Sequence, residues 1–306
     1  MSNGDTLPPR AGTLPPWLRK RLPSGGASRE VLRLLNELGL ATVCAAARCP
    51  NQPECHARGT ATFLIMGERC TRRCRFCAIG EGPPPPLRAE EPQAVAEACA
   101  KMGLKYVVVT SVTRDDLADG GAEHFARTIQ AIRRRLPAAI IEVLTPDFQG
   151  SRPALDTVLR AGPDVFDHNV ETAPRLYAAV RPPGAARGIA PDYARSLDLL
   201  AYVKSRAAGQ PRKLLVKSGL MLGIGETDDE IRQALGDLRK AGVDILTLGQ
   251  YLAPSAAHWP VARFVEPAEF ARWEALARQM GFPGVLAGPF VRSSYHAETV
   301  FEEPRA

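Results

Sequence analysis

Six apolar segments alternate with stretches of helical periodicity along most of the chain, and this alternation limits the fold more than any other feature. The apolar segments are 60–66, 105–112, 138–144, 164–170, 213–219 and 244–252. The helical patterns fall at 92–102, 121–135, 153–161, 191–206, 228–241 and 266–281. Apolar strands that alternate with helices indicate a parallel sheet covered by helices. We therefore expect an α/β fold, a partial (β/α)6 barrel of the TIM type, with its chemistry at the carboxyl ends of the strands.

The rest of the chain divides around this barrel. Residues 1–29 are rich in Pro, Gly and Ser, which predicts a flexible N-terminal tail. We expect an N-terminal extension over 30–59, the barrel over 60–265, and a C-terminal helix and tail over 266–306. Thr227 and Glu230 form the pattern of a capping box at the start of the helix over 228–241.

Charge and hydropathy limit the partners. The net charge of +6 suits an acidic or phosphorylated partner and is far below the dense basic stripe of a nucleic-acid-binding protein. No apolar run reaches the ~18 residues of a membrane span, and the first residues lack the apolar core of a signal peptide. We expect a cytoplasmic protein with reduced thiols, and neither nucleic acid nor membrane as partner.

Six of the seven cysteines form two triplets. The first is C-x4-C-x5-C and the second is C-x3-C-x2-C, and their members are Cys44, Cys49, Cys55, Cys70, Cys74 and Cys77. Cys99 stands alone in a helical segment and is expected to be an inert buried thiol. Spacings this short indicate metal binding. Zinc stays open as the less favoured alternative, because structural zinc takes four ligands and usually two C-x2-C or C-x2-H pairs. Iron–sulfur clusters accept thiolates at such loop spacings.

The second triplet supplies one thiolate too few for a [4Fe–4S] cluster. One iron would keep an open position, at which a substrate or cofactor can bind. The arginines of 69–75 either offset the charge of such a cluster or are solvated. The loop over 70–77 follows the first predicted strand, at the face where a barrel places its chemistry.

The second triplet, with Phe76 before its last cysteine, resembles the signature of radical S-adenosylmethionine enzymes. The first triplet, in "CAAARCPNQPEC", is more specific and resembles the lipoyl synthase family. The similarity continues through "VVTSVTRDDLADGGAEHF", "DVFDHNVETAPRLY", "KSGLMLGIGET" and "GPFVRSSYHA", and covers nearly all of 17–296. The chain departs from the family at His56, where a large aromatic residue is usual, at the alanines of "CAAARC", and in a longer loop over 181–193.

The resemblance implies a sulfurtransferase of lipoate biosynthesis, which inserts two sulfur atoms into an octanoyl chain on a lysine of a lipoyl carrier domain. It implies two [4Fe–4S] clusters and S-adenosylmethionine, with the cluster of 70–77 generating the radical that removes hydrogen from unactivated methylene groups. The 44–55 triplet would hold an auxiliary cluster that donates the sulfur. Its fourth ligand would be a serine of "RSSY", Ser293 or Ser294, of which we prefer Ser294. The N- and C-terminal extensions would then meet and close the open face of the barrel.

Further residues and partners follow from the same resemblance. Polar or apolar side chains at three strand ends are candidates for binding S-adenosylmethionine, and they are Thr110, Ser111, Asn169, Glu171, Gln250 and Leu252. Each of the polar ones could instead cap its strand. Lys217, Arg181 and Arg292 either bind a carboxylate or are solvated. No catalytic side chain is expected beyond the clusters. The partners implied are the lipoyl domains of 2-oxoacid dehydrogenase E2 components, the glycine cleavage H protein, a low-potential electron donor and an iron–sulfur carrier that rebuilds the cluster.

Two other function classes stay open at this point. One is a different two-cluster radical enzyme, either a methylthiotransferase or a biotin-synthase-like enzyme. The other is a non-catalytic protein, an iron–sulfur electron carrier or a zinc-containing binding protein. The predicted barrel favours an enzyme, and "CPNQPEC" together with "RSSY" favours sulfur insertion.

Overall fold

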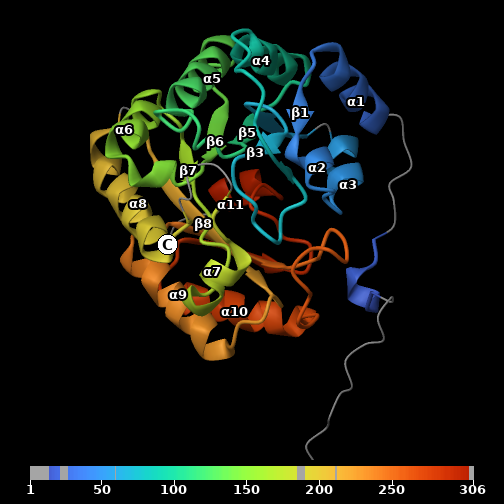
Figure 1. Cartoon of the computed structure of the whole chain (residues 1–306), viewed down its shortest axis with the longest axis vertical. Helices are drawn as coiled ribbons and strands as arrows, with labels where there is room; N and C mark the ends of the chain where they lie inside the picture. The colour runs from blue at the N-terminus through green and yellow to red at the C-terminus, as the bar shows by residue number, and fades with distance from the viewer. Residues whose placement is uncertain (1–13, 21–26, 59, 185–189, 211, 303–306) are drawn as a thin grey trace, which may run out of the picture.

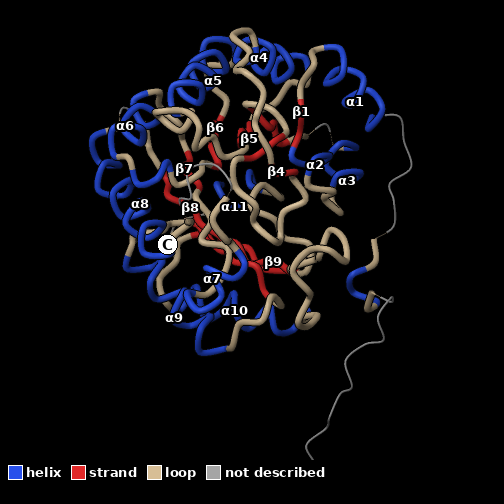
Figure 2. Tube along the Cα trace, viewed as in Figure 1, coloured by secondary structure: helices blue, strands red, loops and turns tan. Residues whose placement is uncertain are grey.

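One curved sheet forms the centre of the described chain, which comprises residues 14–20, 27–58, 60–184, 190–210 and 212–302. In this computed structural model the strands follow the order β1-β2-β5-β6-β7-β8-β9-β10. Their bounds are β1 Ala41–Thr42, β2 Thr62–Ile65, β5 Tyr106–Ser111, β6 Ile140–Leu144, β7 Val165–Asp167, β8 Leu215–Leu222, β9 Ile245–Gln250 and β10 Gly284–Gly288. β1 is antiparallel to β2, and every later neighbour is parallel. Since β1 and β10 end this order, the barrel is open (Figure 2).

The six predicted strands are confirmed as β2 and β5 to β9. β10 adds a parallel strand beyond the six expected, because the tail segment "GVLAG" pairs in register with Ile245–Gly249 of β9. A small second sheet joins β3 (Arg69–Cys70) to β4 (Gly80–Glu81) and frames the cysteine loop between them.

Helices form the outer layer of the barrel, except for α11, which lies inside it (Figure 1). They are α1 Ala27–Glu37, α2 Val43–Ala46, α3 Gln52–Ala57, α4 Glu91–Lys101, α5 Ala122–Arg135, α6 Arg152–Arg160, α7 Pro174–Val180, α8 Tyr193–Arg206, α9 Asp228–Lys240, α10 Pro267–Gln279 and α11 Ala297–Glu302. Short 3-10 turns lie at Pro16–Leu18, Phe148–Gly150 and Ala207–Gly209. The predicted capping box is confirmed, with Thr227 and Glu230 each bonding the other's backbone. None of the described helices is long and apolar enough to cross a membrane.

The C-terminal tail runs through the inside of the barrel. After β10 its backbone passes Gly249 so closely that a Cβ there would stand 2.1 Å from the Val291 carbonyl oxygen. The Ser294 hydroxyl accepts a 2.8 Å hydrogen bond from Thr62, the first residue of β2. α11 then lies at the centre of the barrel in Figure 1, and Phe301 packs at the amino ends of β7, β8 and β9. The tail therefore descends from the carboxyl to the amino ends of the strands.

The N-terminal extension meets this tail. Asn51 donates a 2.7 Å hydrogen bond to the carbonyl of Phe290, and Tyr295 donates one of 2.8 Å to Glu54. Lys20 also binds Glu54, at 2.6 Å, so residues 14–20 are attached to the body. Of the tail expected to be flexible, residues 1–13 and 21–26 lie outside the described residues. The division into four segments stays a prediction.

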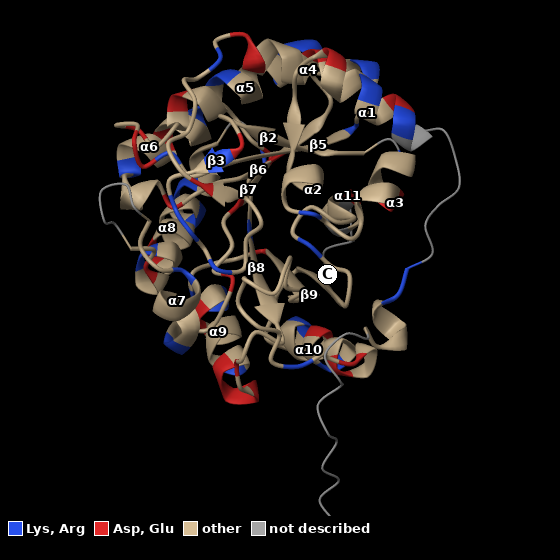
Figure 3. Ribbon diagram, turned by 45° about the vertical axis from the view of Figure 1, so that its right-hand side comes forward, with Lys and Arg blue, Asp and Glu red and all other residues tan. Residues whose placement is uncertain are grey.

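Charged residues lie mainly on the outer helices and loops (Figure 3), but several are buried, and Lys217 is among the deepest of them. Lys217 is 1% exposed and binds both oxygens of the fully buried Glu142 at 2.8 and 2.9 Å. Its third contact is the carbonyl of Ser293, at 2.6 Å. A buried charge must be paired, and this one also fixes the tail.

Candidate active site

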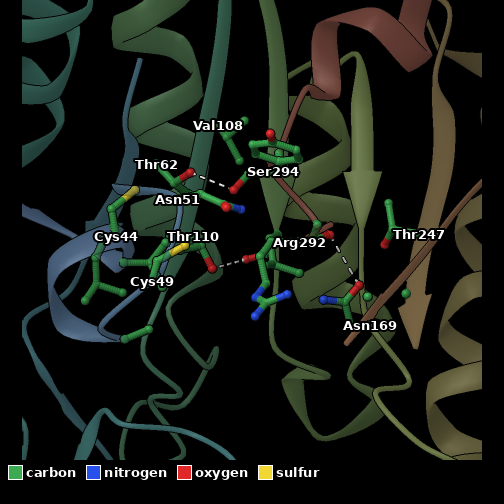
Figure 4. Close-up of a pocket in the computed structure, with 18 of the residues that line it drawn as sticks. Cys44, Cys49, Asn51, Thr62, Val108, Thr110, Asn169, Thr247, Arg292 and Ser294 are labelled. Carbon is green, nitrogen blue, oxygen red and sulfur yellow. Dashed lines mark hydrogen bonds between the residues drawn. The ribbon is translucent and has the colours of Figure 1, made fainter. Parts of the chain in front are cut away.

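All six triplet cysteines line one cavity of about 790 Å³ inside the open barrel. Its walls come from the carboxyl halves of the strands, the N-terminal extension and the C-terminal tail (Figure 4). The predicted site residues all line it: Cys44, Cys49, Cys55, Cys70, Cys74, Cys77, Thr110, Ser111, Asn169, Glu171, Gln250, Leu252 and Ser294. The fold thus brings together the cysteines, the preferred serine and the candidate cofactor-binding residues predicted from the sequence.

Backbone N–H groups already surround the first thiol of the 70–77 loop. The Cys70 sulfur accepts hydrogen bonds from the amides of Arg72, at 3.4 Å, and Thr113, at 3.3 Å. The thiolate is the form of cysteine that ligates metal.

Arg72 holds this loop in place. Its side chain is 2% exposed and binds Asp115 and Asp147, each at 2.7 Å. The Arg72 charge is therefore neither solvated nor free to offset a cluster, because two carboxylates already balance it. Asp116 turns the other way, to Arg114 at 2.7 Å, so the adjacent carboxylates of "RDDL" diverge and form no paired acid site.

Arg181 lies beside the Cys74 thiol. Burial raises the pKa of Cys74, and the neighbouring Arg181 opposes the shift. Burial also raises the pKa of Cys77 to about 12. Arg181 Nη1 donates a 2.5 Å hydrogen bond to the Tyr177 hydroxyl, while Arg181 Nε has no partner among the described residues. Of the two roles expected for Arg181, solvation or carboxylate binding, its burial favours carboxylate binding.

The first triplet, Cys44, Cys49 and Cys55, lies in the N-terminal extension. Cys44 lies in α2, whose N-cap Thr42 accepts from the Ala45 amide at 3.3 Å, and Cys55 lies in α3. The Cys49 amide donates to the Cys44 carbonyl at 3.0 Å, which folds the loop back. Burial, followed by the nearby Cys44 and Cys49, raises the pKa of Cys55 to about 12. The three free thiols are therefore close neighbours.

Thr62 joins this triplet to the tail. Its hydroxyl donates to Ser294, and it lies within hydrogen-bonding reach of the Cys44 thiol (Figure 4). Ser293 turns elsewhere, toward the Asp167 carboxylate and, at 3.3 Å, the Asn169 amide oxygen. Of the two serines, Ser294 is the one beside the triplet. Thr62 carried no signal in the sequence, because threonine is an ordinary strand residue.

The polar residues at the ends of two strands differ in whether their side chains already have hydrogen-bond partners. The Thr110 hydroxyl donates to the Leu144 carbonyl at 2.9 Å, whereas the buried Ser111 hydroxyl has no partner among the described residues. Glu171 adopts a left-handed φ of 70° and bridges to β8, which turns it into the cavity. Burial raises the pKa of Glu171, and Arg181 opposes this. Ser111, Glu171 and Arg181 therefore hold unused polar capacity.

Gln250 is different, because its side-chain amide is already hydrogen-bonded to four backbone groups. It donates to the carbonyls of Leu222, Tyr251 and Arg263 at 3.2, 2.8 and 3.1 Å, and accepts from the amide of Val265 at 2.7 Å. Its side chain fixes the loop after β9. The contact with adenine expected from its place in the chain stays a prediction, as does that of Leu252.

The donors present fit iron–sulfur clusters. The six thiols belong to two groups, all are free, and a serine hydroxyl stands beside one group. Within the described residues, no three His, Cys, Asp or Glu side chains converge as around a single metal ion. Sulfur-rich ligand sets suit iron–sulfur clusters, and the orphaned Ser111 hydroxyl and Arg181 Nε suit a polar ligand beside them.

Solved structures share this architecture. The chain aligns with HydG, a maturase of the [FeFe]-hydrogenase, with a TM-score of 0.55 at 16% identity, covering 84% of this chain and 62% of that one. It aligns with Streptococcus suis SuiB bound to S-adenosylmethionine with a TM-score of 0.54 at 11% identity, covering 83% and 57%. It thus spans somewhat less than two thirds of both, and at these identities the likeness concerns the fold alone.

Sequence relatives are much closer. A family profile described as the Radical SAM superfamily matches residues 64–238. A lipoyl synthase of Rubrobacter xylanophilus is 52% identical over 291 residues, covering 95% of this chain and 87% of the relative. One of Methylococcus capsulatus is 54% identical over 285 residues, covering 93% and 85%. The chain belongs to the lipoyl synthase family of the radical SAM superfamily.

Proposed function

We propose that this enzyme inserts two sulfur atoms into the octanoyl chain carried on a lysine of a lipoyl carrier domain. The observation that carries the proposal is the meeting of both cysteine triplets and Ser294 in one cavity. A radical enzyme with a single cluster needs only Cys70, Cys74 and Cys77. Relatives named lipoyl synthase, aligned over nearly the whole chain, support the same reaction.

Cys70, Cys74 and Cys77 are the residues that would hold the radical-generating [4Fe–4S] cluster. Bound there with S-adenosylmethionine, it supplies a radical able to take hydrogen from methylene groups too weakly acidic for any base. The chain positions the cofactor: the guanidinium of Arg181 and the hydroxyl of Ser111 are the available donors for its amino-acid end. Glu171 is the nearby acceptor.

Cys44, Cys49, Cys55 and Ser294 are the residues that would hold the auxiliary cluster and its sulfur. The hydrogen bond from Thr62 keeps Ser294 on the Cys44 side of the cavity. A serine oxygen suits iron less well than a thiolate does, so it makes the weakest link of this ligand set. The tail and α11 fill the barrel below the site and keep water from it.

The partners belong to the proposal as well. An octanoylated carrier domain, either the lipoyl domain of a 2-oxoacid dehydrogenase E2 component or the glycine cleavage H protein, would present the lysine arm at the cavity. A low-potential electron donor and an iron–sulfur carrier complete the cycle. These are cytoplasmic components, in keeping with the reduced state that the six ligand thiols require.

The test is anaerobic turnover of the reconstituted protein with an octanoyl-lysine peptide, S-adenosylmethionine and a reductant. We expect about eight irons per chain and a product heavier by two sulfur atoms with the corresponding hydrogens lost. Replacing Cys70, Cys74 and Cys77 by alanine should leave about four irons and stop formation of 5′-deoxyadenosine.

Replacing Cys44, Cys49 and Cys55 by alanine is the matched variant. It should retain 5′-deoxyadenosine formation and lose sulfur transfer. Lipoyl product from this second variant would show that the sulfur comes from elsewhere.

A further inference from the structure

Arg292 places a cation in the cavity without a protein counter-charge. Its only hydrogen bond among the described residues is from Nη1 to the carbonyl of its own neighbour Val291, at 2.7 Å. No described carboxylate forms an ion pair with it. Gly249 makes this placement possible, since a Cβ at that position would meet the Val291 oxygen at 2.1 Å and Arg292 Nη1 at 3.4 Å.

Two buried arginines, Arg72 and Arg114, contrast with Arg292. Arg72 is shared by two buried aspartates, and Arg114 binds Asp116. A guanidinium removed from water costs free energy unless an anion balances it. Arg292 lines the cavity and has no carboxylate partner among the described residues, so its guanidinium is available to an anion that binds there.

The surroundings of Arg292 indicate which ligand that is. Arg292 lines the same cavity as Cys49 and stands two residues before Ser294. In Figure 4 the guanidinium lies between the first triplet and Asn169, on the inner side of Cys49. It is thus beside the ligand set assigned above to the auxiliary cluster. An iron–sulfur cluster with thiolate ligands is anionic, and hydrogen bonds to its sulfurs are a main control of its potential.

Building on the proposed function, we propose that Arg292 is a positioning residue for the auxiliary cluster, donating N–H hydrogen bonds and positive charge to its sulfur face at Cys49. The residue fixes the orientation of the sulfur donor relative to Ser294. It also stabilises the more reduced, more negative form of the cluster. In "RSSY" the arginine and the second serine therefore hold the same group, one through sulfur and one through iron.

The experiment measures the midpoint potential of the auxiliary cluster in full-length protein carrying alanine at Cys70, Cys74 and Cys77, so that a single cluster titrates. Arg292→Gln should shift the reduction equilibrium at least tenfold toward the oxidised form, which is about 59 mV for one electron. Arg292→Lys keeps the charge and should recover part of the shift. Loss of the auxiliary irons alone in Arg292→Gln would support the proposal equally.

Arg48→Gln is the matched control. Arg48 is adjacent to Cys49 and lines the same cavity, but its side chain is exposed, so solvent screens its charge. Equal shifts of the midpoint potential in Arg292→Gln and Arg48→Gln would show that only the net charge matters, and would overturn the proposal. So would an unchanged potential in Arg292→Gln. A weaker affinity for S-adenosylmethionine with an unchanged potential would assign the guanidinium to the carboxylate of that cofactor instead.

Apoprotein provides an independent measurement. Arg292→Gln removes a cation that has no protein partner, so it should not lower the thermal stability of the apoprotein. Arg72→Gln leaves two buried aspartates without their counter-charge and should lower it clearly. If wild-type protein binds only about four irons, the proposed function fails. If it binds about eight and forms lipoyl product while Arg292→Gln changes nothing, only the role of Arg292 fails.

Discussion

Replacing His56 by phenylalanine should stabilise the apoprotein. His56 lies in α3, is 0% exposed, and neither ring nitrogen has a hydrogen-bond partner among the described residues. A neutral imidazole carries one donor and one acceptor, so both are buried without compensation. The lipoyl synthase family usually has a large aromatic residue at this position, which indicates that the surrounding space takes a ring.

The expected gain follows from two opposing effects. An unsatisfied buried polar group costs about 1–3 kcal/mol, and His56 removes two such groups from water. The larger phenyl ring costs about 1–2 kcal/mol in overpacking. With about 2 kcal/mol for each of the two unsatisfied groups and about 2 kcal/mol for overpacking, the net gain is about 2 kcal/mol, measurable as a higher urea midpoint at an unchanged m-value.

The gain should also depend on pH. Burial lowers the pKa of His56 below its ordinary 6.5, so below that pH the unfolded chain binds a proton that the folded chain resists. Wild-type stability therefore falls as the pH drops through this range, and the phenylalanine variant loses that part of the decrease. The difference between the two proteins should be larger at about pH 5.5 than at about pH 7.5.

His168→Phe is the control with the opposite sign. His168 is also buried, but its Nδ1 lies 2.9 Å from the Thr145 carbonyl and its Nε2 lies 3.0 Å from the Ser196 hydroxyl. The same substitution there strands two partners and should destabilise the protein by about 1–3 kcal/mol. If His56→Phe destabilised the apoprotein as much as His168→Phe, the view that His56 is an uncompensated buried group would be refuted.

Two further predictions concern the tail. Ser294→Ala should retain 5′-deoxyadenosine formation and slow sulfur transfer, whereas Ser293→Ala loses contacts to residues at the end of β7 and should mainly lower the stability of the protein. Mass analysis of the peptide product distinguishes the two variants. If both turn over normally, neither serine is a cluster ligand. Gly249→Ala places a Cβ 2.1 Å from the Val291 oxygen and should displace the tail at a cost of about 1–3 kcal/mol. Gly236→Ala in α9, where the nearest atom is 3.9 Å away, should instead stabilise the protein by about 0.5–1 kcal/mol. Urea unfolding measures both variants, and equal effects would contradict the close passage of the tail.

The barrel could be predicted from the sequence because its determinants are local. Each strand is an apolar run of the right length, and each helix has its own periodicity and cap, as Thr227 and Glu230 illustrate. The cysteine spacings are local as well. β10 and α7 were harder: β10 is a short run that becomes a strand only by pairing with β9, and α7 follows Glu171, whose left-handed φ gives no sequence signal.

What the sequence could not supply is the direction in which a side chain turns. Gln250 stands where a cofactor contact is expected, yet its amide is bound to four backbone groups. Arg72, Arg181 and Arg292 all lie in regions that sequence reasoning left between ligand binding and solvation. The structure gives each a different environment: two carboxylates for Arg72, a tyrosine and a thiol for Arg181, and no protein anion for Arg292. These partners come from distant parts of the chain, so residue type alone does not identify them.

The adjacent serines of "RSSY" show how one short motif serves two parts of the fold. Neighbouring side chains in the turn diverge, so a single segment contacts both walls of the barrel. Ser293 binds the end of β7 on one wall, and its carbonyl is held by Lys217. Ser294 binds the start of β2 on the other wall, beside Cys44. The first serine therefore anchors the tail and leaves the second one free to face the thiols. The adjacent serines therefore tie the tail to opposite walls of the barrel, and Ser294 comes to lie on the Cys44 side.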